Sequence, residues 1–224
     1  MISFSNRIEA GRLLAQALKS LAKENPIIVA LPRGGLPVAG EIAKELNAPL
    51  DFLAVKKIGA PGNPEFALGA VSEDGEPLLS EDLIERFAFD RNEVLEIANR
   101  KILEAREQAK YLRAAAPPIE VRSRTVILVD DGLATGSTME AAVRIMRKKG
   151  ASKIIVAIPV ASTDAYERIG KLADKVVSLL TPPIFYAVGA FYDDFSQVSD
   201  AEAEEILRTN RQSHSWSQET GLFT

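Results

Sequence analysis

Short apolar runs that alternate with segments of helical spacing constrain the fold of this chain more than any other feature. A continuous apolar run between turns is typical of a strand that is buried on both faces of a parallel sheet. Such runs lie at 27–31, 125–129, 153–160 and 176–180, and a further strand is expected at 51–57. Helices are expected at 7–21, 36–46, 139–149 and 164–173. Strands that alternate with helices are joined by right-handed crossovers. The sequence therefore predicts an α/β fold with a mostly parallel, twisted sheet flanked by helices.

A charged helical segment at about 80–116 interrupts this alternation. Asp90 and Glu93 resemble a helix-capping pair, and apolar residues at helical spacing follow them. The Pro117–Pro118 pair then ends the helix. Within this segment, residues from about Asp90 to Ala116 are therefore predicted to form one long, charged helix with one apolar face.

The domain organisation follows from length and polarity. With 224 residues, of which 46% are hydrophobic, the chain is long enough for one sizeable domain with a core. We expect a single domain over 1–212. Ser199 and Glu202 form a capping box before a short last helix, and the polar tail at 213–224 is expected to fray.

Composition excludes several classes of function. The chain has no cysteine and one histidine, His214 in the polar tail, so disulfides, thiol catalysis, Cys-ligated zinc and histidine-based triads are not expected. A net charge of −4 argues against a nucleic-acid partner. No apolar run approaches the roughly 20 residues of a membrane span, and the N-terminus lacks a signal-peptide core. A cytoplasmic protein without membrane or nucleic-acid partners is predicted.

Two adjacent carboxylates, Asp130 and Asp131, follow the apolar run at 126–129. After a two-residue spacer, five small or hydroxyl-bearing residues open a helix: Ala134, Thr135, Gly136, Ser137 and Thr138. Small residues at a helix N-terminus let backbone N–H groups approach a phosphate, and hydroxyl groups add donors. A ribose ring would separate that phosphate from the carboxylates, which can accept hydrogen bonds from its hydroxyls. Taken singly, each element is also an ordinary turn or helix start.

The run Val-Ile-Leu-Val-Asp-Asp-Gly-Leu-Ala-Thr-Gly-Ser-Thr at 126–138 resembles, without a gap, the phosphoribosyl-diphosphate signature of type I phosphoribosyltransferases. The resemblance covers about 4–207 and is strongest to a bacterial subfamily of predicted phosphoribosyltransferases. It implies the type I phosphoribosyltransferase fold with a small C-terminal hood. It also implies that Asp130 and Asp131 are catalytic residues that orient the ribose, and that 134–138 bind its 5-phosphate. Relative to the best-known members, 80–116 is an insertion that could cover the site or form a dimer contact.

Further loops are assigned roles by the same resemblance. The loop after the first strand, with Arg33, Gly34 and Gly35, is expected to bind diphosphate, often through a strained or cis peptide, with glycines that permit unusual dihedral angles. Lys57 resembles one lysine of a basic pair with which family members also contact the diphosphate. A lysine exposed to solvent at the end of a strand is an equally good explanation. Residues 58–65 lie where the family has a mobile catalytic lid.

The segment at 187–195 is similar to the base-proximal segment of the hypoxanthine-guanine branch. Tyr186 or Ala187 would then lie beside the acceptor, and Asp193 would hold a metal-bound water, with Asp194 an equally good candidate. An aromatic core edge followed by a turn is the alternative.

The resemblance implies transfer of a 5-phosphoribosyl group from phosphoribosyl diphosphate to a nitrogen acceptor, expected to be a nucleobase, with release of diphosphate. Mg²⁺ is the implied cofactor, and a homo-oligomer is expected. The alternative is a non-catalytic regulator that binds phosphoribosyl diphosphate. A phosphosugar hydrolase ranks third. Release of diphosphate in the presence of a nucleobase would indicate the transferase. Binding without release would indicate the regulator, and release without an acceptor would indicate the hydrolase.

Overall fold

A five-stranded parallel sheet forms the centre of the molecule, which we describe from a computed structural model over residues 3–219, leaving aside the side chains of Glu65 and of 214–219. Its strand order is β2-β1-β6-β7-β8, and every neighbouring pair is parallel. The strands are β1 (Ile27–Ala30), β2 (Leu50–Phe52), β6 (Thr125–Val129), β7 (Lys153–Val160) and β8 (Lys175–Leu180). The predicted α/β fold with a mostly parallel sheet is confirmed.

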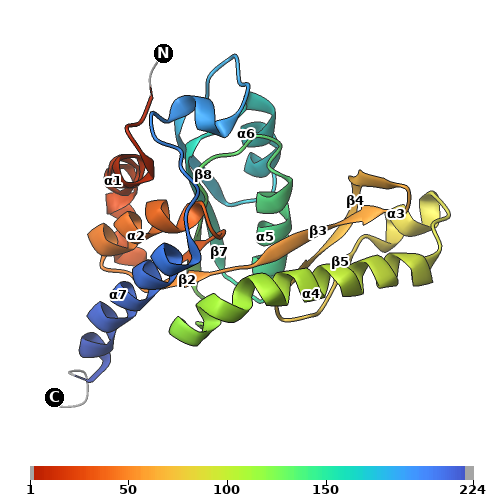
Figure 1. Ribbon diagram of the computed structural model, residues 1–224, viewed down its shortest axis with the longest axis horizontal. Helices are drawn as coiled ribbons and strands as arrows, with labels where there is room; N and C mark the ends of the chain where they lie inside the picture. The colour runs from red at the N-terminus through yellow and green to blue at the C-terminus, as the bar shows by residue number, and fades with distance from the viewer. Residues whose placement is uncertain (1–2, 220–224) are drawn as a thin grey trace.

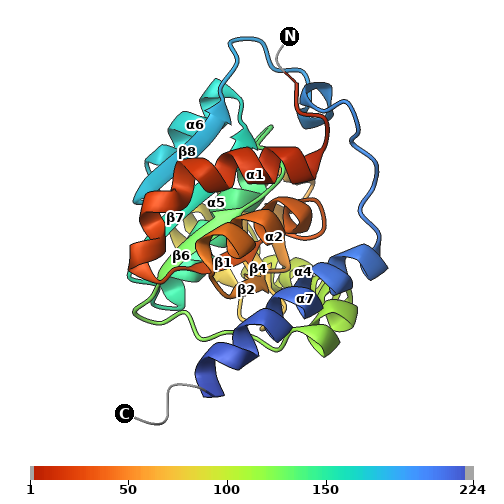
Figure 2. The ribbon, with the colours of Figure 1, turned by 90° about the vertical axis from the view of Figure 1, so that its left-hand side faces the viewer.

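Helices cover both faces of this main sheet because successive residues of a strand point to opposite faces. Ile28 and Ile127 point into a core formed with α1 and α2, whereas Val29 and Leu128 point into a second core formed with α5. Figure 2 shows α1 and α2 in front of the sheet. The helices of these layers are α1 (Arg7–Leu18), which continues as the 3₁₀ turn η1 (Lys19–Glu24), α2 (Gly35–Leu46), α5 (Ser137–Lys148) and α6 (Thr163–Gly170).

A second, antiparallel sheet and two helices form an arm, defined here as residues 55–115, that extends to one side of the main sheet (Figure 1). Its elements are β3 (Val55–Ala60), β4 (Asn63–Ser72), β5 (Leu78–Leu79), α3 (Glu81–Arg86) and α4 (Arg91–Ala115). Apolar residues of β3 and β4, among them Ile58 and Leu68, pack against Val94 and Ala98 of α4. The charged insertion therefore has its buried face on this small sheet.

Two sequence-based expectations in this region are wrong. The strand expected at 51–57 is split between the two sheets, because β2 ends at Phe52 and β3 begins at Val55. The segment at 58–65, expected to be a loop, contains the end of β3, a turn with Gly62 at a φ of 72° and the start of β4, whereas its role as a mobile lid stays a prediction. Its glycines and prolines serve this tight turn.

The hood combines both ends of the chain. Residues 181–196, with the 3₁₀ turn η2 (Val188–Phe191), run beside the N-terminal segment through a parallel bridge between Phe4 and Tyr192. The Phe4 amide donates to the Phe191 carbonyl at 2.8 Å. The N-terminal residues are thereby placed next to the carboxyl ends of the strands.

The last helix, α7 (Asp200–Glu219), is 20 residues long, so the expectation of a short helix is wrong. Its predicted start is correct, since the Glu202 amide donates to Ser199 Oγ at 3.1 Å. Of the predicted tail, residues 220–224 and the side chain of His214 lie outside the described part of the structure. Among the described helices, none is long and apolar enough to span a bilayer.

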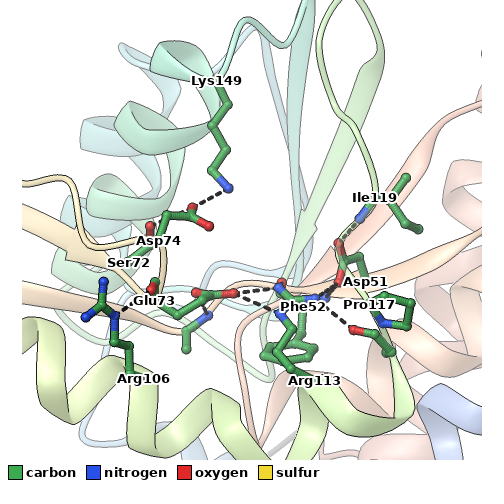
Figure 3. A network of polar contacts seen from close by, with 12 residues as sticks. Asp51, Phe52, Ser72, Glu73, Asp74, Arg106, Arg113, Pro117, Ile119 and Lys149 are labelled. Carbon is green, nitrogen blue, oxygen red and sulfur yellow. Dashed lines mark hydrogen bonds and ion pairs between the residues drawn. The ribbon is translucent and has the colours of Figure 1, made fainter.

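A buried polar network joins the arm to the main sheet (Figure 3). Arg113 of α4 donates to Asp51 of β2 at 2.6 Å and to Glu73, which follows β4, at 2.5 Å. Its guanidinium carbon lies 3.8 Å from the centroid of the Phe52 ring. The arginine therefore connects both sheets and the inserted helix at one point.

Candidate functional site

The carboxyl ends of β1 and β6 lie side by side and bring two predicted loops together. The two strands pair in register up to Ala30 and Val129, and the Leu31 amide donates to the Val129 carbonyl at 2.8 Å. The loop containing Gly34 therefore lies against the acidic pair that follows β6. In open parallel sheets, this edge is where ligands bind.

Asp130 and Asp131 are half-buried at this edge and have different partners. Asp130 Oδ1 accepts a hydrogen bond from the Asp131 amide at 2.9 Å. Asp131 Oδ2 accepts from Arg7 Nε at 2.9 Å, and Arg7 Nη2 lies at the same distance. Within the part of the chain that the structure describes, Asp130 Oδ2 and Asp131 Oδ1 accept no hydrogen bond. Each carboxylate thus keeps one oxygen for a ligand.

The electrostatics of the pair follow from burial and mutual repulsion. Burial, and then the charge of Asp131, raises the pKa of Asp130 well above its ordinary value. Burial also raises the pKa of Asp131, although the Arg7 guanidinium acts in the opposite direction. A ligand that brings positive charge or hydroxyl donors would relieve this repulsion.

The turn predicted to bind phosphate leads into α5. Gly136 is the N-cap residue of α5 with a φ of 69° and has no side chain to cap the helix, while Thr135 Oγ1 accepts from the Ser137 amide at the long distance of 3.5 Å. A left-handed backbone of this kind suits glycine. The hydroxyls of Thr135 and Ser137 lie 3.2 Å apart, and Ser162 Oγ donates to the Ala134 carbonyl at 2.7 Å. The predicted residues, including the exposed Thr138, therefore form a helix N-terminus whose backbone donors can meet an anion.

The predicted diphosphate loop contains a cis peptide bond between Pro32 and Arg33. The expectation that its glycines adopt unusual dihedral angles is wrong, because Gly34 has a φ of −57° and a ψ of −34°. Glycine is needed for close approach instead. A Cβ atom at Gly34 would overlap Asp131 Oδ2, and one at Gly35 would lie 2.7 Å from the Val129 carbonyl oxygen.

Two helices hold this loop from the opposite side. Arg33 Nη1 lies 3.0 Å from Asp200 Oδ1 at the start of α7. Gln108 of α4 donates through Nε2 to the Pro32 carbonyl at 3.1 Å. The Arg33 side chain is about one-third exposed, at 33%, so it remains accessible to an anionic ligand.

Lys57 lies on β3 and lines a cleft of about 490 Å³ between the arm and α5. Ser137 of the turn lines the same cleft. The structure therefore places Lys57 in the same cleft as Ser137, and its predicted contact with the diphosphate stays a prediction.

The hood places the predicted acceptor-side residues at its surface. Tyr186 is 84% exposed, and Ala187 is exposed as well. The next residue, Val188, touches the backbone after the acidic pair, since a Cβ atom at Gly132 would lie 2.6 Å from Val188 Cγ1.

The candidate for a metal-bound water, Asp193, is exposed and accepts from Ser3 Oγ at 2.9 Å. No cluster of three metal-binding side chains occurs among the described residues.

Arg7 and Tyr192 are site residues that the sequence does not reveal. Arg7 is the first residue of α1, where it looks like an ordinary solvated helix start, yet its side chain is only 11% exposed. Tyr192 donates its hydroxyl to the Asp131 carbonyl at 2.6 Å, and burial, together with the Asp131 charge, raises its pKa. Both residues reach the acidic pair from distant parts of the chain.

Comparisons with known proteins agree with this geometry. Residues 6–196 match the family model of the phosphoribosyl transferase domain. A Mycobacterium tuberculosis protein classed provisionally as a phosphoribosyl transferase is 41% identical over 204 residues, which cover 91% of this chain and 46% of that protein. The chain thus spans about half the length of these mycobacterial relatives. An adenine phosphoribosyltransferase of Rhodococcus jostii is 28% identical over 172 residues, or 76% of each chain.

The fold is also seen in a solved structure. A Thermus thermophilus protein is 44% identical, with a TM-score of 0.87 over 93% of this chain and 99% of that one.

Proposed function

Because the chain belongs to the phosphoribosyl transferase family, we propose that it transfers a 5-phosphoribosyl group from phosphoribosyl diphosphate to a nitrogen acceptor and releases diphosphate. One observation carries the proposal. The N-terminus of α5, with a glycine at its N-cap position, comes shortly after two carboxylates, Asp130 and Asp131, that each keep one oxygen without a donor among the described residues. This order of groups suits a phosphate joined to a sugar.

In this proposal the 5-phosphate binds the turn at 134–138. Backbone N–H groups, the helix dipole and the hydroxyls of Thr135, Ser137 and Thr138 stabilise its charge. Asp130 and Asp131 accept hydrogen bonds from the ribose hydroxyls. Their negative charge also favours the positive charge that develops on the ribose when the bond to diphosphate breaks.

The leaving diphosphate binds the loop of Arg33, Gly34 and Gly35. Arg33 supplies charge-assisted donors, and Lys57 of the arm adds a second positive charge. The surface ion pair between Arg33 and Asp200 is weak enough for a multiply charged anion to displace Asp200. The loop thus stabilises the negative charge that builds on the diphosphate as it leaves.

Mg²⁺ fits the oxygen donors of this site. Magnesium is commonly held by one or two carboxylates together with substrate phosphates and water. Asp130 and Asp131 are the residues that would hold it here, and the ion would offset the charge of the diphosphate. Asp193, a single exposed carboxylate bound to Ser3, stays a candidate for a metal-bound water.

The acceptor is expected to be a nucleobase that lies under the hood near Tyr186 and Ala187. The high exposure of Tyr186 favours a second candidate function, a non-catalytic regulator that binds phosphoribosyl diphosphate. We also expect a cytoplasmic homo-oligomer.

The test compares the wild type with the double variant Asp130→Asn, Asp131→Asn. Calorimetry measures binding of phosphoribosyl diphosphate with Mg²⁺, and a coupled assay measures diphosphate release with a panel of nucleobases and amines. We expect wild-type turnover on at least one acceptor and a loss of about 100-fold or more in the double variant, as when a preorganised electrostatic contact is removed. Asp164→Asn, an exposed acid in the first turn of α6, is the matched control and should retain activity.

Three outcomes separate the readings. Undiminished turnover in the double variant would contradict the assignment of the acidic pair. Tight binding without diphosphate release on any acceptor would favour the regulator. Diphosphate release without an acceptor would indicate hydrolysis.

A further inference from the structure

The guanidinium group of Arg7 uses all three of its nitrogens inside the molecule. Nε and Nη2 lie 2.9 Å from Asp131 Oδ2, and Nη1 donates to the Ser196 carbonyl at 2.7 Å. The side chains of Arg7 and Asp131 are 11% and 14% exposed. An ion pair of this kind is far less screened than one at the surface.

The hood encloses this arginine with aromatic rings. The guanidinium carbon lies 3.9 Å from the centroid of the Phe195 ring, which stacks on Tyr192 at 5.1 Å. Tyr192 in turn donates to the Asp131 carbonyl at 2.6 Å. The hood therefore contacts Asp131 twice, directly through Tyr192 and indirectly through Arg7.

These contacts fix which carboxylate oxygen faces a ligand. Asp131 Oδ2 is enclosed between Arg7 and the backbone of Gly34, where a Cβ atom would overlap it. Asp131 Oδ1 accepts no hydrogen bond from any residue that the structure describes. A partial rotation of the carboxylate would break both contacts with the guanidinium, whereas a half-turn only exchanges its two equivalent oxygens, so Arg7 fixes the plane in which the free oxygen lies.

We propose that Arg7 is a positioning residue of the sugar site. It holds Asp131 Oδ2 against the diphosphate loop, so that Oδ1 is presented to a ribose hydroxyl, and it ties this carboxylate to the hood that covers the acceptor side. The inference rests on the proposed function, since it assumes that the acidic pair binds ribose. The positive charge of Arg7 also balances one of two adjacent carboxylates, which lets both stand at one sheet edge.

Arginine is required for this role because its planar fork can meet a carboxylate and a carbonyl while it stacks on a ring. A lysine has one ammonium group and can contact Asp131 or Ser196, but it cannot reproduce the stack on Phe195. Arg12, further along α1, is a natural control. It is 66% exposed and pairs with Glu41 on α2.

The experiment measures the affinities of two probes, ribose 5-phosphate and inorganic phosphate, by calorimetry. Inorganic phosphate reports on the anion-binding loops without the sugar contacts, whereas ribose 5-phosphate reports on both. The variants are Arg7→Met, Arg7→Lys, Asp131→Asn and the double variant Arg7→Met, Asp131→Asn, with Arg12→Met as control.

We expect Arg7→Met to weaken ribose 5-phosphate binding about tenfold, the equivalent of one hydrogen bond to a charged group, and to leave phosphate binding unchanged. Arg7→Lys should recover part of the loss. When Arg7→Met is added to Asp131→Asn, it should have no further effect, because the carboxylate that Arg7 positions is gone. A merely structural role would lower both affinities, and its effect would persist in the double variant.

Equal ribose 5-phosphate affinity in the wild type and Arg7→Met, with wild-type binding intact, would overturn the role of Arg7 alone. If the wild type binds ribose 5-phosphate no more tightly than inorganic phosphate, the proposed function is contradicted as well. If Arg7→Met lacks a cooperative unfolding transition, Arg7→Lys carries the test. An unchanged ratio of its two affinities would then overturn the proposal.

Discussion

Two half-buried arginines, Arg113 and Arg7, each meet carboxylates at a junction of the molecule, and their surroundings differ in one respect. Around Arg113, both oxygens of Asp51 and of Glu73 accept a hydrogen bond, from the guanidinium or from backbone amides. Around Arg7, the acidic pair keeps two oxygens without donors among the described residues.

This difference separates a structural network from a binding site. Burying a charge costs free energy that full hydrogen bonding can offset. The Arg113 network is complete, so it can hold the arm to the main sheet without a ligand. The acidic pair at Asp130 is incomplete, and a ligand with hydroxyls or a cation would complete it.

The largest expected effect is the loss of the complete network. Arg113→Met leaves Asp51 and Glu73 buried without their cation, and we expect the free energy of unfolding to fall by about 3–5 kcal/mol. Urea denaturation measures this loss. Lys101→Met, which breaks an exposed pair with Glu104, should change the same free energy by less than about 0.5 kcal/mol. Equal effects of the two substitutions would show that the buried Arg113 network stabilises the fold no more than an exposed ion pair does.

A smaller effect is expected where the diphosphate loop touches the acidic pair. In Gly34→Ala, the added methyl group overlaps Asp131 Oδ2, so we expect about 1–3 kcal/mol of lost stability and weaker ribose 5-phosphate binding. Gly170→Ala is the control, because no atom lies within 4 Å of its added carbon. That substitution should be neutral, or stabilising by about 0.4–1 kcal/mol. Unchanged ribose 5-phosphate affinity in Gly34→Ala would argue against the contact.

The smallest effect concerns pH and the incomplete pair. Burial raises the folded-state pKa of Asp130 above the unfolded value of about 3.9, so the folded state binds this proton more tightly. The resulting stability is fully present below the unfolded pKa and is lost as pH rises through the folded pKa. Because the substitution removes the buried negative charge, we expect Asp130→Asn to stabilise the ligand-free protein at pH 7 by an amount on the order of 1 kcal/mol.

Denaturant titrations of Asp130→Asn and the wild type between about pH 4 and pH 8 measure this effect. Stability of the variant should vary less with pH than that of the wild type. A variant less stable than the wild type at pH 7 would mean that the ionised carboxylate contributes to the fold, as Asp51 does.

The site could be predicted where its parts are contiguous in sequence. Asp130, Asp131 and the turn at 134–138 follow one another closely along the chain, so strand, turn and helix start are local properties. The position of Gly34 could also be predicted, but the reason for its glycine could not. That reason is an atom of Asp131, which follows a neighbouring strand.

Non-local packing explains the failures. The segment at 58–65 looks like a loop because of its glycines and prolines, yet Ile58 and Leu68 are buried against the inserted helix, which holds the segment as a hairpin. Arg7 is separated from Asp131 by 124 residues, and no local pattern marks the pair.

By itself, the sequence determined the alternation of strands and helices, the parallel sheet and the order of carboxylates, turn and helix at its edge, because these depend on neighbouring residues and on hydrophobic periodicity. Only the tertiary structure decided which carboxylate oxygens are left for a ligand. That choice depends on side chains such as Arg7 and Tyr192, which reach the sheet edge from opposite ends of the chain and meet only when the hood packs against the main sheet.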